Sequence, residues 1–280
     1  MNKMKIGCGT VNFRKYSLKE ALRIIKKAGY EYVEPQATAP WCPHINVDKD
    51  RPKEFKRMLE NFGFRGATAL WSTHGAIIPD PKSVEYGKKC IIWAAEAGIP
   101  VVNTGDGFKP EEMSEEDAFK ILQERILEIL EVAERYKVCL AIEPHGTFSL
   151  SAAGLKKIMS ISNSKYLGIN YDTANIHRAS YVETKNGTYS WKLIGERQDE
   201  VEVLKAIAKR VVHVHIKDIK GKSCVALGKG EVNLKGCIKV LKENGYDGVL
   251  SLETEGEYDI KEAEKLIRSS YRYLVKVLGE

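Results

Sequence analysis

The chain of 280 residues is 43% hydrophobic and 29% charged, with a formal net charge of +6. This composition is typical of a globular protein with enough apolar side chain for a large core. Without a block of Lys and Arg, the modest charge does not indicate nucleic-acid binding. No run approaches about 18 apolar residues, and the N-terminus lacks a hydrophobic segment of signal-peptide length, so we expect no membrane contact and a cytoplasmic protein.

The six cysteines are scattered along the chain and include no C-x-x-C pair. Several of them lie within apolar strand or helix patterns, as buried free thiols do. This usage also indicates a reducing, cytoplasmic setting.

Strand-like runs alternate with amphipathic segments through the first half of the chain. The pattern predicts strands at residues 4–8, 32–34, 66–71 and 100–104. It predicts helices at residues 17–29, 51–61, 83–97 and 115–136. The first of these helices is well marked, because Ser17 and Glu20 form a capping-box pattern at its start and Gly29 is suited to its end.

In the second half, four short apolar runs each end at one side chain that can bind a metal. The runs cover residues 138–143, 167–172, 211–215 and 248–253, and their last side chains are Glu143, Asp172, His215 and Glu253. Turn residues bound each run and helix-compatible sequence separates it from the next, which predicts parallel strands of one sheet. Three carboxylates gathered together would repel one another unless a cation lay between them.

The two faces of these four strands differ in character. Side chains alternate between faces along a strand, so residues two before each candidate ligand share its face. That face carries mainly small or polar residues: Cys139, Ala141, Gly168, Asn170, His213, Val249 and Ser251. The opposite face carries bulky apolar residues: Leu140, Ile142, Ile169, Tyr171, Val214, Ile216, Leu250 and Leu252. This asymmetry is typical of a barrel whose outer strand face packs on helices and whose narrow lumen holds a site near one mouth.

The alternation of strands and helices predicts an α/β fold, a single (β/α)8 TIM barrel that spans residues 1–280 as one domain. Two helices, capped by Asn233 and Asp259, complete the pattern. An open doubly wound sheet is the structural rival. It is disfavoured because no glycine-rich phosphate turn follows the first strand, and because ligands on four consecutive strands converge only in a sheet that curves round.

In barrels of this kind, the loops that follow the strands form the active face. The loop at residues 178–199 follows the sixth strand and carries Tyr181, Tyr189 and Trp191. Its length and its aromatic residues make it a candidate lid. The alternative is a mobile insertion without a role.

A site of two Glu, one Asp and one His is mostly hard oxygen with one imidazole, and would suit Mn²⁺, Mg²⁺, Co²⁺ or Zn²⁺. A divalent ion chelated by two adjacent sugar oxygens stabilises an enediolate, the intermediate of aldose–ketose isomerisation and of epimerisation beside a carbonyl. Two glutamates that face each other across the barrel could remove a proton from one face and return one to the other. Glu143 and Glu253 are our candidates for this catalytic pair.

Five segments of the chain resemble the sugar phosphate isomerase/epimerase superfamily, the xylose isomerase-like barrels that include the D-tagatose 3-epimerases. These segments are residues 140–145, 170–175, 211–218, 227–231 and 245–253. The resemblance implies a TIM barrel in which Glu143, Asp172, His215 and Glu253 bind one divalent metal ion, often Mn²⁺. It also implies that Glu143 and Glu253 double as acid and base residues.

The match to any one member of that superfamily is poorer. Ketose 3-epimerases have a substrate-contacting His three residues after the metal Asp, where this chain has Asn175, and the nearest His is His177. They also carry an Arg shortly after the metal His, where this chain has Asp218, Gly221 and Lys222. These differences leave the substrate open.

Several other residues are candidates for substrate contacts. Trp71 and His74 end the third strand, Glu34 ends the second, and Lys217 follows the metal His and could bind an anionic group. The full set of candidate substrate-binding residues is Glu34, Trp71, His74, His145, Asn175, His177 and Lys217. His213 shares a face with His215, and we expect it to fill the lumen or to support the ligands. We also expect Asp218 to brace a loop.

We therefore expect a metal-dependent isomerase or epimerase of a small carbohydrate, sugar phosphate or keto acid. A lyase that dehydrates a keto-inositol or cleaves an oxidised glycoside would use the same metal and base, and remains the alternative. A DNA-repair endonuclease of the endonuclease IV type requires further ligands that this chain lacks. A sugar-binding barrel without turnover is the non-enzymatic alternative, and the helical outer face could form a homo-oligomer.

Overall fold

The computed structural model describes residues 4–72, 76–178, 180–185, 188–193 and 197–279. Within this part of the chain, ten parallel strands form one curled sheet in the order β3-β5-β6-β7-β8-β11-β14-β1-β2-β4. In chain order these strands are β1 (Lys5–Gly9), β2 (Tyr32–Glu34), β3 (Gln36–Ala37), β4 (Gly66–Ala67), β5 (Leu70–Ser72), β6 (Val101–Gly107), β7 (Cys139–Gly146), β8 (Leu167–Asp172), β11 (Val211–Ile216) and β14 (Val249–Leu252).

The sheet closes on itself because four of its strands are halves of two interrupted strands. Pro35 alone separates β2 from β3, and it has no backbone N–H to give to a ladder. Strand β2 pairs with β4 and β3 pairs with β5, so the two ends of the sheet order join. The N–H of Thr68 donates to Val33 and that of Trp71 donates to Pro35, which continues the hydrogen bonding across both interruptions. The result is the predicted barrel of eight parallel strands, with the expected strand at 66–71 divided in two.

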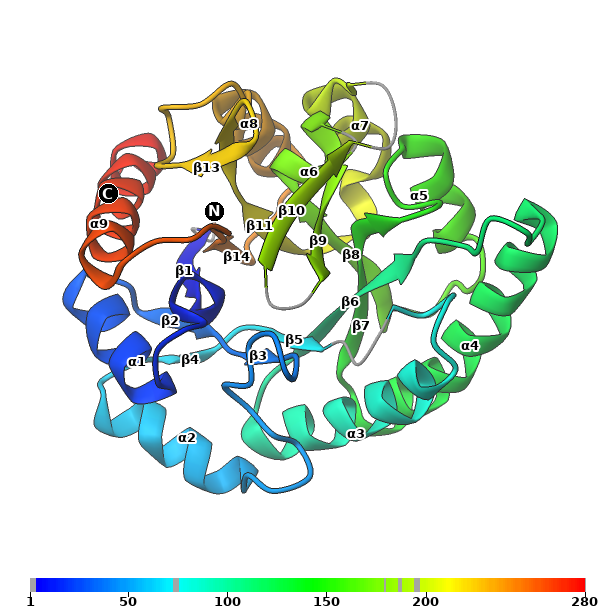
Figure 1. Cartoon of the computed structure of the whole chain (residues 1–280), viewed down its shortest axis with the longest axis horizontal. Coiled ribbons are helices and arrows are strands. Elements are labelled where there is room, and N and C mark those ends of the chain that lie inside the picture. Colours follow the sequence, from blue (N-terminus) through cyan, green and yellow to red (C-terminus); the bar gives the residue numbers. More distant parts are fainter. Residues whose placement is uncertain (1–3, 73–75, 179, 186–187, 194–196, 280) are drawn as a thin grey trace.

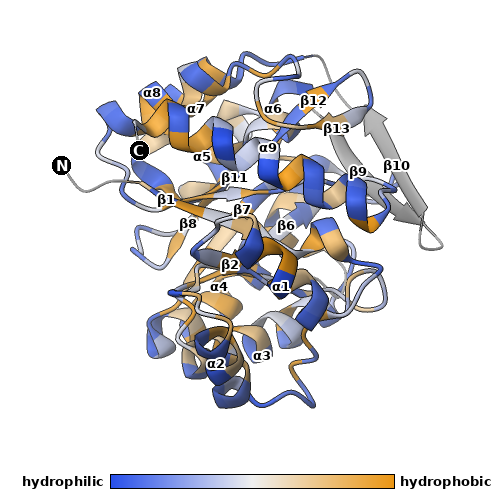
Figure 2. Cartoon of the chain, turned by 90° about the vertical axis from the view of Figure 1, so that its left-hand side faces the viewer, coloured by the Kyte–Doolittle hydropathy of each residue, from blue (hydrophilic) through white to orange (hydrophobic). Residues whose placement is uncertain are grey.

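The helices other than the short α6 (Thr173–Arg178), which lies at the barrel mouth, form a ring outside the strands (Figure 1). They are α1 (Leu18–Lys27), α2 (Pro52–Asn61), α3 (Lys82–Ala97), α4 (Glu115–Tyr136), α5 (Ala152–Met159), α7 (Glu200–Ile207), α8 (Leu234–Glu243) and α9 (Ile260–Leu278). The predicted capping box is present at α1, where Ser17 and Glu20 each accept the other's backbone N–H. Figure 2 shows hydrophilic residues over much of α2, whose buried residues are Phe55 and Leu59.

Two separate apolar clusters confirm the predicted difference between the strand faces. The large core between strands and helices includes all eight bulky residues expected on the outer face, among them Leu140, Tyr171 and Leu252. A small second cluster contains Ala69, Val101, Cys139 and Ala141, which fill the lumen. Small residues below the ligand positions thus close the bottom of the barrel and leave the polar site at its mouth. All six cysteines are buried and free.

Two short antiparallel ribbons lie outside the barrel sheet. Strands β12 (Asp218–Lys220) and β13 (Ser223–Val225) form one of them. As predicted, Asp218 braces the loop that follows, because its carboxylate accepts the N–H groups of Gly228, Gly230 and Val232.

The expected lid at 178–199 contains a hairpin of β9 (Ser180–Lys185) and β10 (Thr188–Leu193) in place of an open loop. The side chains of Tyr181, Tyr189 and Trp191 and residues 179, 186–187 and 194–196 lie outside the description, so closure remains a prediction. In the described part of the chain, none of the helices combines the length and the apolar character needed to cross a bilayer.

The core predicts different costs for two neighbouring truncations in α4. Ile126 is fully buried against the barrel, whereas Leu127 is 40% exposed. We expect Ile126→Ala to lower the free energy of unfolding by about 2–5 kcal/mol, because it leaves a cavity in the core. The matched control, Leu127→Ala, should change it by less than about 0.5 kcal/mol. Urea unfolding followed by circular dichroism measures both values, and equal costs would contradict this packing.

Candidate metal centre

Four buried side chains meet at the carboxyl ends of consecutive strands. Glu143 lies in β7, Asp172 ends β8, His215 lies in β11 and Glu253 directly follows β14. Each offers one ligand atom, and these four atoms all lie within 4.8 Å of one another. The side chains are between 0% and 6% exposed. The order β7-β8-β11-β14 in the sheet explains the convergence, because neighbouring parallel strands end at the same edge of the barrel.

The two ring nitrogens of His215 have different surroundings. Nε2 lies 2.8 Å from Oε1 of Glu34, while Nδ1 lies 2.9 Å from Oε2 of Glu143 and 3.4 Å from Oε2 of Glu253. If Nε2 carries a proton for Glu34, Nδ1 presents a lone pair beside two carboxylate oxygens. Acceptor atoms this close together require a proton or a metal ion among them, so the donor set fits a divalent cation.

Glu34 lies beneath His215 and has protein partners on both carboxylate oxygens. Oε1 accepts from Asn103 at 2.8 Å and meets His215, and Oε2 accepts from Ser251 at 2.6 Å and meets Nε2 of His213 at 2.9 Å. Glu34 is fully buried. Burial alone would raise its pKa, but the two histidines outweigh burial and hold the pKa well below its ordinary value. A carboxylate that accepts the ring N–H of a metal-binding histidine commonly fixes the orientation of that ring.

The two glutamates of the cluster have opposite electrostatic environments. Burial raises the pKa of Glu143 to about 8, against the lowering effect of His215. Burial also acts to raise the pKa of Glu253, but His215 and Lys217 outweigh it and the net shift is downward. Glu143 is oriented by two amides, because the Nδ2 groups of Asn170 and Asn175 donate to its oxygens at 2.8 and 3.1 Å.

A buried ammonium group joins three carboxylates beside the cluster. Nζ of Lys217 lies 2.8 Å from Asp172, 2.6 Å from Glu253 and 2.7 Å from Glu255. Burial opposes the charge of Lys217, yet the three carboxylates raise its pKa well above the ordinary value. Burial raises the pKa of Glu255 to about 7, although Lys217 opposes that shift. Sequence reasoning did not single out Glu255; its place two residues after Glu253 was the available signal.

Helix α6 holds Asp172 and Asn175 in register. Oδ1 of Asp172 accepts the N–H groups of Ala174 and Asn175, both at 2.8 Å, at the start of the helix. Asn175 then donates to Glu143 and to the backbone carbonyl of Pro144. His177, further along the helix, points away from the cluster, because its Nδ1 lies 2.8 Å from Glu200 of α7.

Two aromatic rings flank the cluster. The ring centroid of Trp71 lies 6.0 Å from that of His215 and 6.0 Å from that of His145. Burial and the charge of Lys217 lower the pKa of His145 to about 4, which favours a neutral imidazole. His74 lies outside the described residues.

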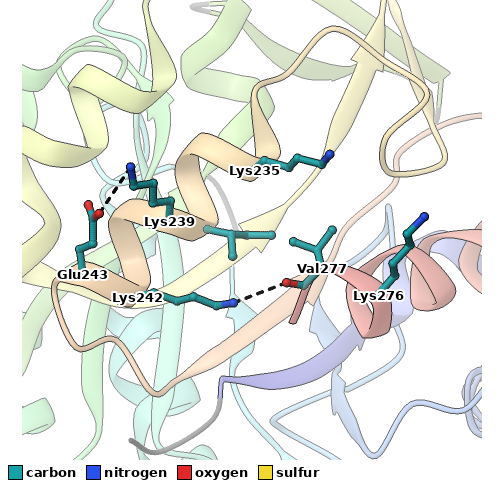
Figure 3. A pocket seen from close by; sticks show the side chains of 7 residues that line it. Lys235, Lys239, Lys242, Glu243, Lys276 and Val277 are labelled. Atoms are coloured by element: carbon teal, nitrogen blue, oxygen red, sulfur yellow. Dashed lines mark hydrogen bonds and ion pairs between the residues drawn. The ribbon is translucent and has the colours of Figure 1, made fainter. Parts of the chain in front are cut away.

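A groove of about 510 Å³ on the outer surface is separate from this cluster (Figure 3). It lies between α8 and α9 and is lined by Lys235, Ile238, Lys239, Lys242, Glu243, Lys276 and Val277. Lys242 donates to the carbonyl of Val277 at 3.5 Å, and Lys239 lies 3.7 Å from Glu243. Lys242 and Lys276 lie in the last turns of α8 and α9, where their charge balances the partial negative charge of the helix C-termini.

Comparison with known proteins gives one family match over most of the chain. A family model described as a xylose isomerase-like TIM barrel matches residues 22–277. An uncharacterized protein of Methanocaldococcus jannaschii is 28% identical over 198 residues, which are 66% of this chain and 61% of that protein. An inosose dehydratase of Clostridium perfringens is 27% identical over 136 residues, 37% of this chain and 46% of the dehydratase. The chain therefore matches less than two thirds of the length of either relative.

Solved structures share the fold over nearly the whole chain. A D-tagatose 3-epimerase-like protein has a TM-score of 0.78 at 21% identity, covering 99% of this chain and 97% of that one. A protein named IOLI, solved with a bound zinc atom, has a TM-score of 0.75 at 19% identity over 99% and 98%. A barrel protein of Mycobacterium smegmatis, in complex with magnesium, has a TM-score of 0.76 at 17% identity over 98% and 96%. At these identities the likeness is one of fold.

The network beneath His215 predicts a large cost for one amide substitution. Glu34→Gln should lower the free energy of unfolding by about 1–3 kcal/mol, because an NH2 group would then face the buried donors that the carboxylate now satisfies. The matched control is Glu31→Gln, an exposed carboxylate paired with Arg65, which should cost less than about 1 kcal/mol. Chemical denaturation compares the two variants, and a neutral Glu34→Gln would show that the network is not required.

Proposed function

Because the chain belongs to the xylose isomerase-like TIM barrel family, we propose that it is a divalent-metal-dependent isomerase or epimerase of a small carbohydrate, sugar phosphate or keto acid. The observation that carries this proposal is the convergence of Glu143, Asp172, His215 and Glu253 to within 4.8 Å. Three carboxylates and one imidazole form a donor set for one hard or borderline divalent cation.

These four residues would hold the ion, for which we propose Mn²⁺. Mg²⁺, Co²⁺ and Zn²⁺ suit the same donors, and related barrels have been solved with zinc and with magnesium. When bound, the ion would polarise a substrate carbonyl and stabilise negative charge on adjacent oxygens. Glu34 would serve this centre indirectly, by keeping the proton of His215 on Nε2 so that Nδ1 faces the ligand oxygens.

Glu143 and Glu253 are proposed to move the proton between the two faces of the reacting carbon. Their environments differ, because burial raises the pKa of Glu143 to about 8, whereas His215 and Lys217 outweigh burial and lower the pKa of Glu253. Pairs of carboxyl groups whose pKa values are pushed apart are typical of acid–base catalysis. Asn170 and Asn175 would keep the Glu143 carboxyl directed into the site.

The remaining polar and aromatic groups would position the substrate. Trp71 and His145 form an aromatic rim beside His215, suited to the apolar face and the hydroxyl groups of a sugar. Glu34, Asn175, His177 and Lys217 are all engaged by protein groups, so a direct substrate contact requires that each exchange a partner. We place Trp71 and His145 first among the proposed substrate contacts because the Trp71 ring lies beside both His145 and the liganding His215.

A dehydratase acting on a keto-inositol is the second candidate function. It is favoured by the similarity to inosose dehydratases, which covers 37% of this chain. Removal of a proton beside a carbonyl begins both reactions, so the same metal and base would serve either. The products differ, because dehydration expels a hydroxyl group whereas epimerisation returns the proton.

Metal binding can be tested without a known substrate. Mn²⁺ at about 100 times its dissociation constant should stabilise the wild-type protein by about 2.7 kcal/mol, because only the folded chain gathers the donors. Asp172→Asn should lose most of this stabilisation, whereas Asp48→Asn, which changes an exposed carboxylate paired with Lys89, should keep it. Thermal unfolding with and without the ion is the measurement. A wild-type protein unaffected by Mn²⁺, Mg²⁺, Co²⁺ and Zn²⁺ would rule out the centre.

The reaction can be tested by isotope exchange in ²H₂O with a panel of ketoses and keto-inositols. We expect deuterium to enter the substrate at a carbon adjacent to the carbonyl, because a carboxylate takes the proton and exchanges it with solvent. Glu143→Gln should abolish this exchange, and Glu131→Gln on the exposed side of α4 should leave it unchanged. Nuclear magnetic resonance of the products reads the outcome.

The same spectra separate the two candidate functions. A reversible mixture of stereoisomers supports the isomerase or epimerase, and an irreversible product that has lost water supports the dehydratase. Exchange that persists in Glu143→Gln would remove this residue from the mechanism.

A further inference from the structure

Lys217 shares oxygens with two of the four proposed metal ligands. Its Nζ lies 2.8 Å from Oδ2 of Asp172 and 2.6 Å from Oε2 of Glu253. The same Oε2 of Glu253 faces Nδ1 of His215, so it belongs to the inner side of the cluster. An ammonium group and a divalent cation compete for such oxygens, both by occupying lone pairs and by repelling each other.

Glu255 provides Lys217 with a third partner outside the ligand set. Its Oε2 lies 2.7 Å from Nζ, and the side chain is buried. Glu255 lies two residues after Glu253, beyond the end of β14, and its own N–H points to Sγ of Cys224. This buried carboxylate lies outside the four-residue donor set, yet it contacts the same ammonium group that contacts Asp172 and Glu253.

The backbone of Lys217 is fixed, so any exchange of partners is confined to its side chain. Thr173 clamps this backbone, because Oγ1 of Thr173 accepts the N–H of Lys217 at 3.0 Å and donates to its carbonyl at 2.7 Å. The stem therefore stays at the site while Nζ divides its contacts among three carboxylates that all lie within reach.

We propose that Lys217 and Glu255 form a pair that sets the metal affinity of the centre, with Lys217 opposing the ion and Glu255 drawing the ammonium away from Asp172 and Glu253. The proposal rests on the proposed metal-dependent function. It assigns opposite effects on metal affinity to the two residues. Lys217 lowers the affinity because its positive charge lies at the ligand oxygens, and Glu255 raises it because it draws that charge away. If the two residues only held the ligands in place, loss of either one would loosen the ligands, and both substitutions would weaken metal binding.

Titration calorimetry with Mn²⁺ alone tests the pair. Lys217→Met should bind Mn²⁺ about tenfold or more tightly than wild type, because removal of one charge a few ångströms away is worth at least ~1.4 kcal/mol. Glu255→Gln should bind about tenfold or more weakly, because Lys217 then rests on the two ligands alone. Lys217→Arg, which keeps the charge, should restore an affinity near that of wild type.

Two matched controls repeat the charge changes on exposed neighbours. Lys220→Met and Glu257→Gln remove the same charges from β12 and from the loop after β14, and should change the Mn²⁺ affinity by less than about threefold because exposed charges are screened. Circular dichroism without metal verifies that each variant is folded. If Lys217→Met does not fold, Glu255→Gln decides alone.

The outcomes separate this inference from the function on which it rests. If the wild-type protein binds Mn²⁺ but Lys217→Met binds it equally or more weakly, or Glu255→Gln binds it equally or more tightly, the pair is overturned and the metal centre is left intact. Wild-type protein that binds no divalent ion overturns both. Opposite shifts in the two variants, with unchanged controls, support the pair.

Discussion

The candidate site depends on one constraint: several carboxylates are buried close together, and positively charged or hydrogen-bonding groups must balance their negative charge. Glu143, Asp172, Glu253 and Glu255 all lie at one mouth of the barrel, at most 8% exposed. Isolated buried carboxylates are costly, so each must meet a cation, a histidine or a set of donors. His215 and Lys217 are the groups that meet them, and both occur at the same strand end, two residues apart. The position of β11 therefore determines whether the site can exist.

The strands of the barrel hold the site in place through side chains on both of their faces. Outward side chains of the strands pack with the helices in one large core, while small inward residues such as Ala141 fill the lumen below the site. Glu34, His213 and Ser251 form a polar layer between this filling and the mouth. Because the layer is closed by hydrogen bonds, His215 cannot turn without breaking a buried contact. Rigidity of this kind is what a centre with preset geometry requires.

The sequence was sufficient for the barrel and for the residues that gather at its mouth, because both follow from period-two alternation along strands. It was insufficient wherever a side chain acts beyond a strand end. His177 turns toward Glu200, since a helix begins at Thr173 and rotates it away from the mouth. Glu34, the last residue of β2, contacts His213 and His215, a pairing that the alternation within one strand does not predict. Lys217 and Glu255 lie just past the strand ends, two residues after His215 and Glu253, and this spacing alone did not predict that they would pair. The hairpin of β9 and β10 lies where a loop was expected.

The proposed centre accounts for the start of a reaction more fully than for its end. Proton removal beside a carbonyl needs only the ion, Glu143 and Glu253, and these residues come from the fixed ends of β7 and β14. The fate of the resulting intermediate depends on which group faces the neighbouring hydroxyl. An acid at that place protonates the hydroxyl group and helps it to leave as water, whereas a group that donates no proton leaves the hydroxyl group on the substrate. A neutral His145 beside Trp71 is poised to donate one hydrogen bond but is a poor source of a proton near neutral pH, since its pKa is lowered to about 4. A neutral imidazole of this kind can hydrogen-bond a hydroxyl group without expelling it, in keeping with the isomerase or epimerase that we propose.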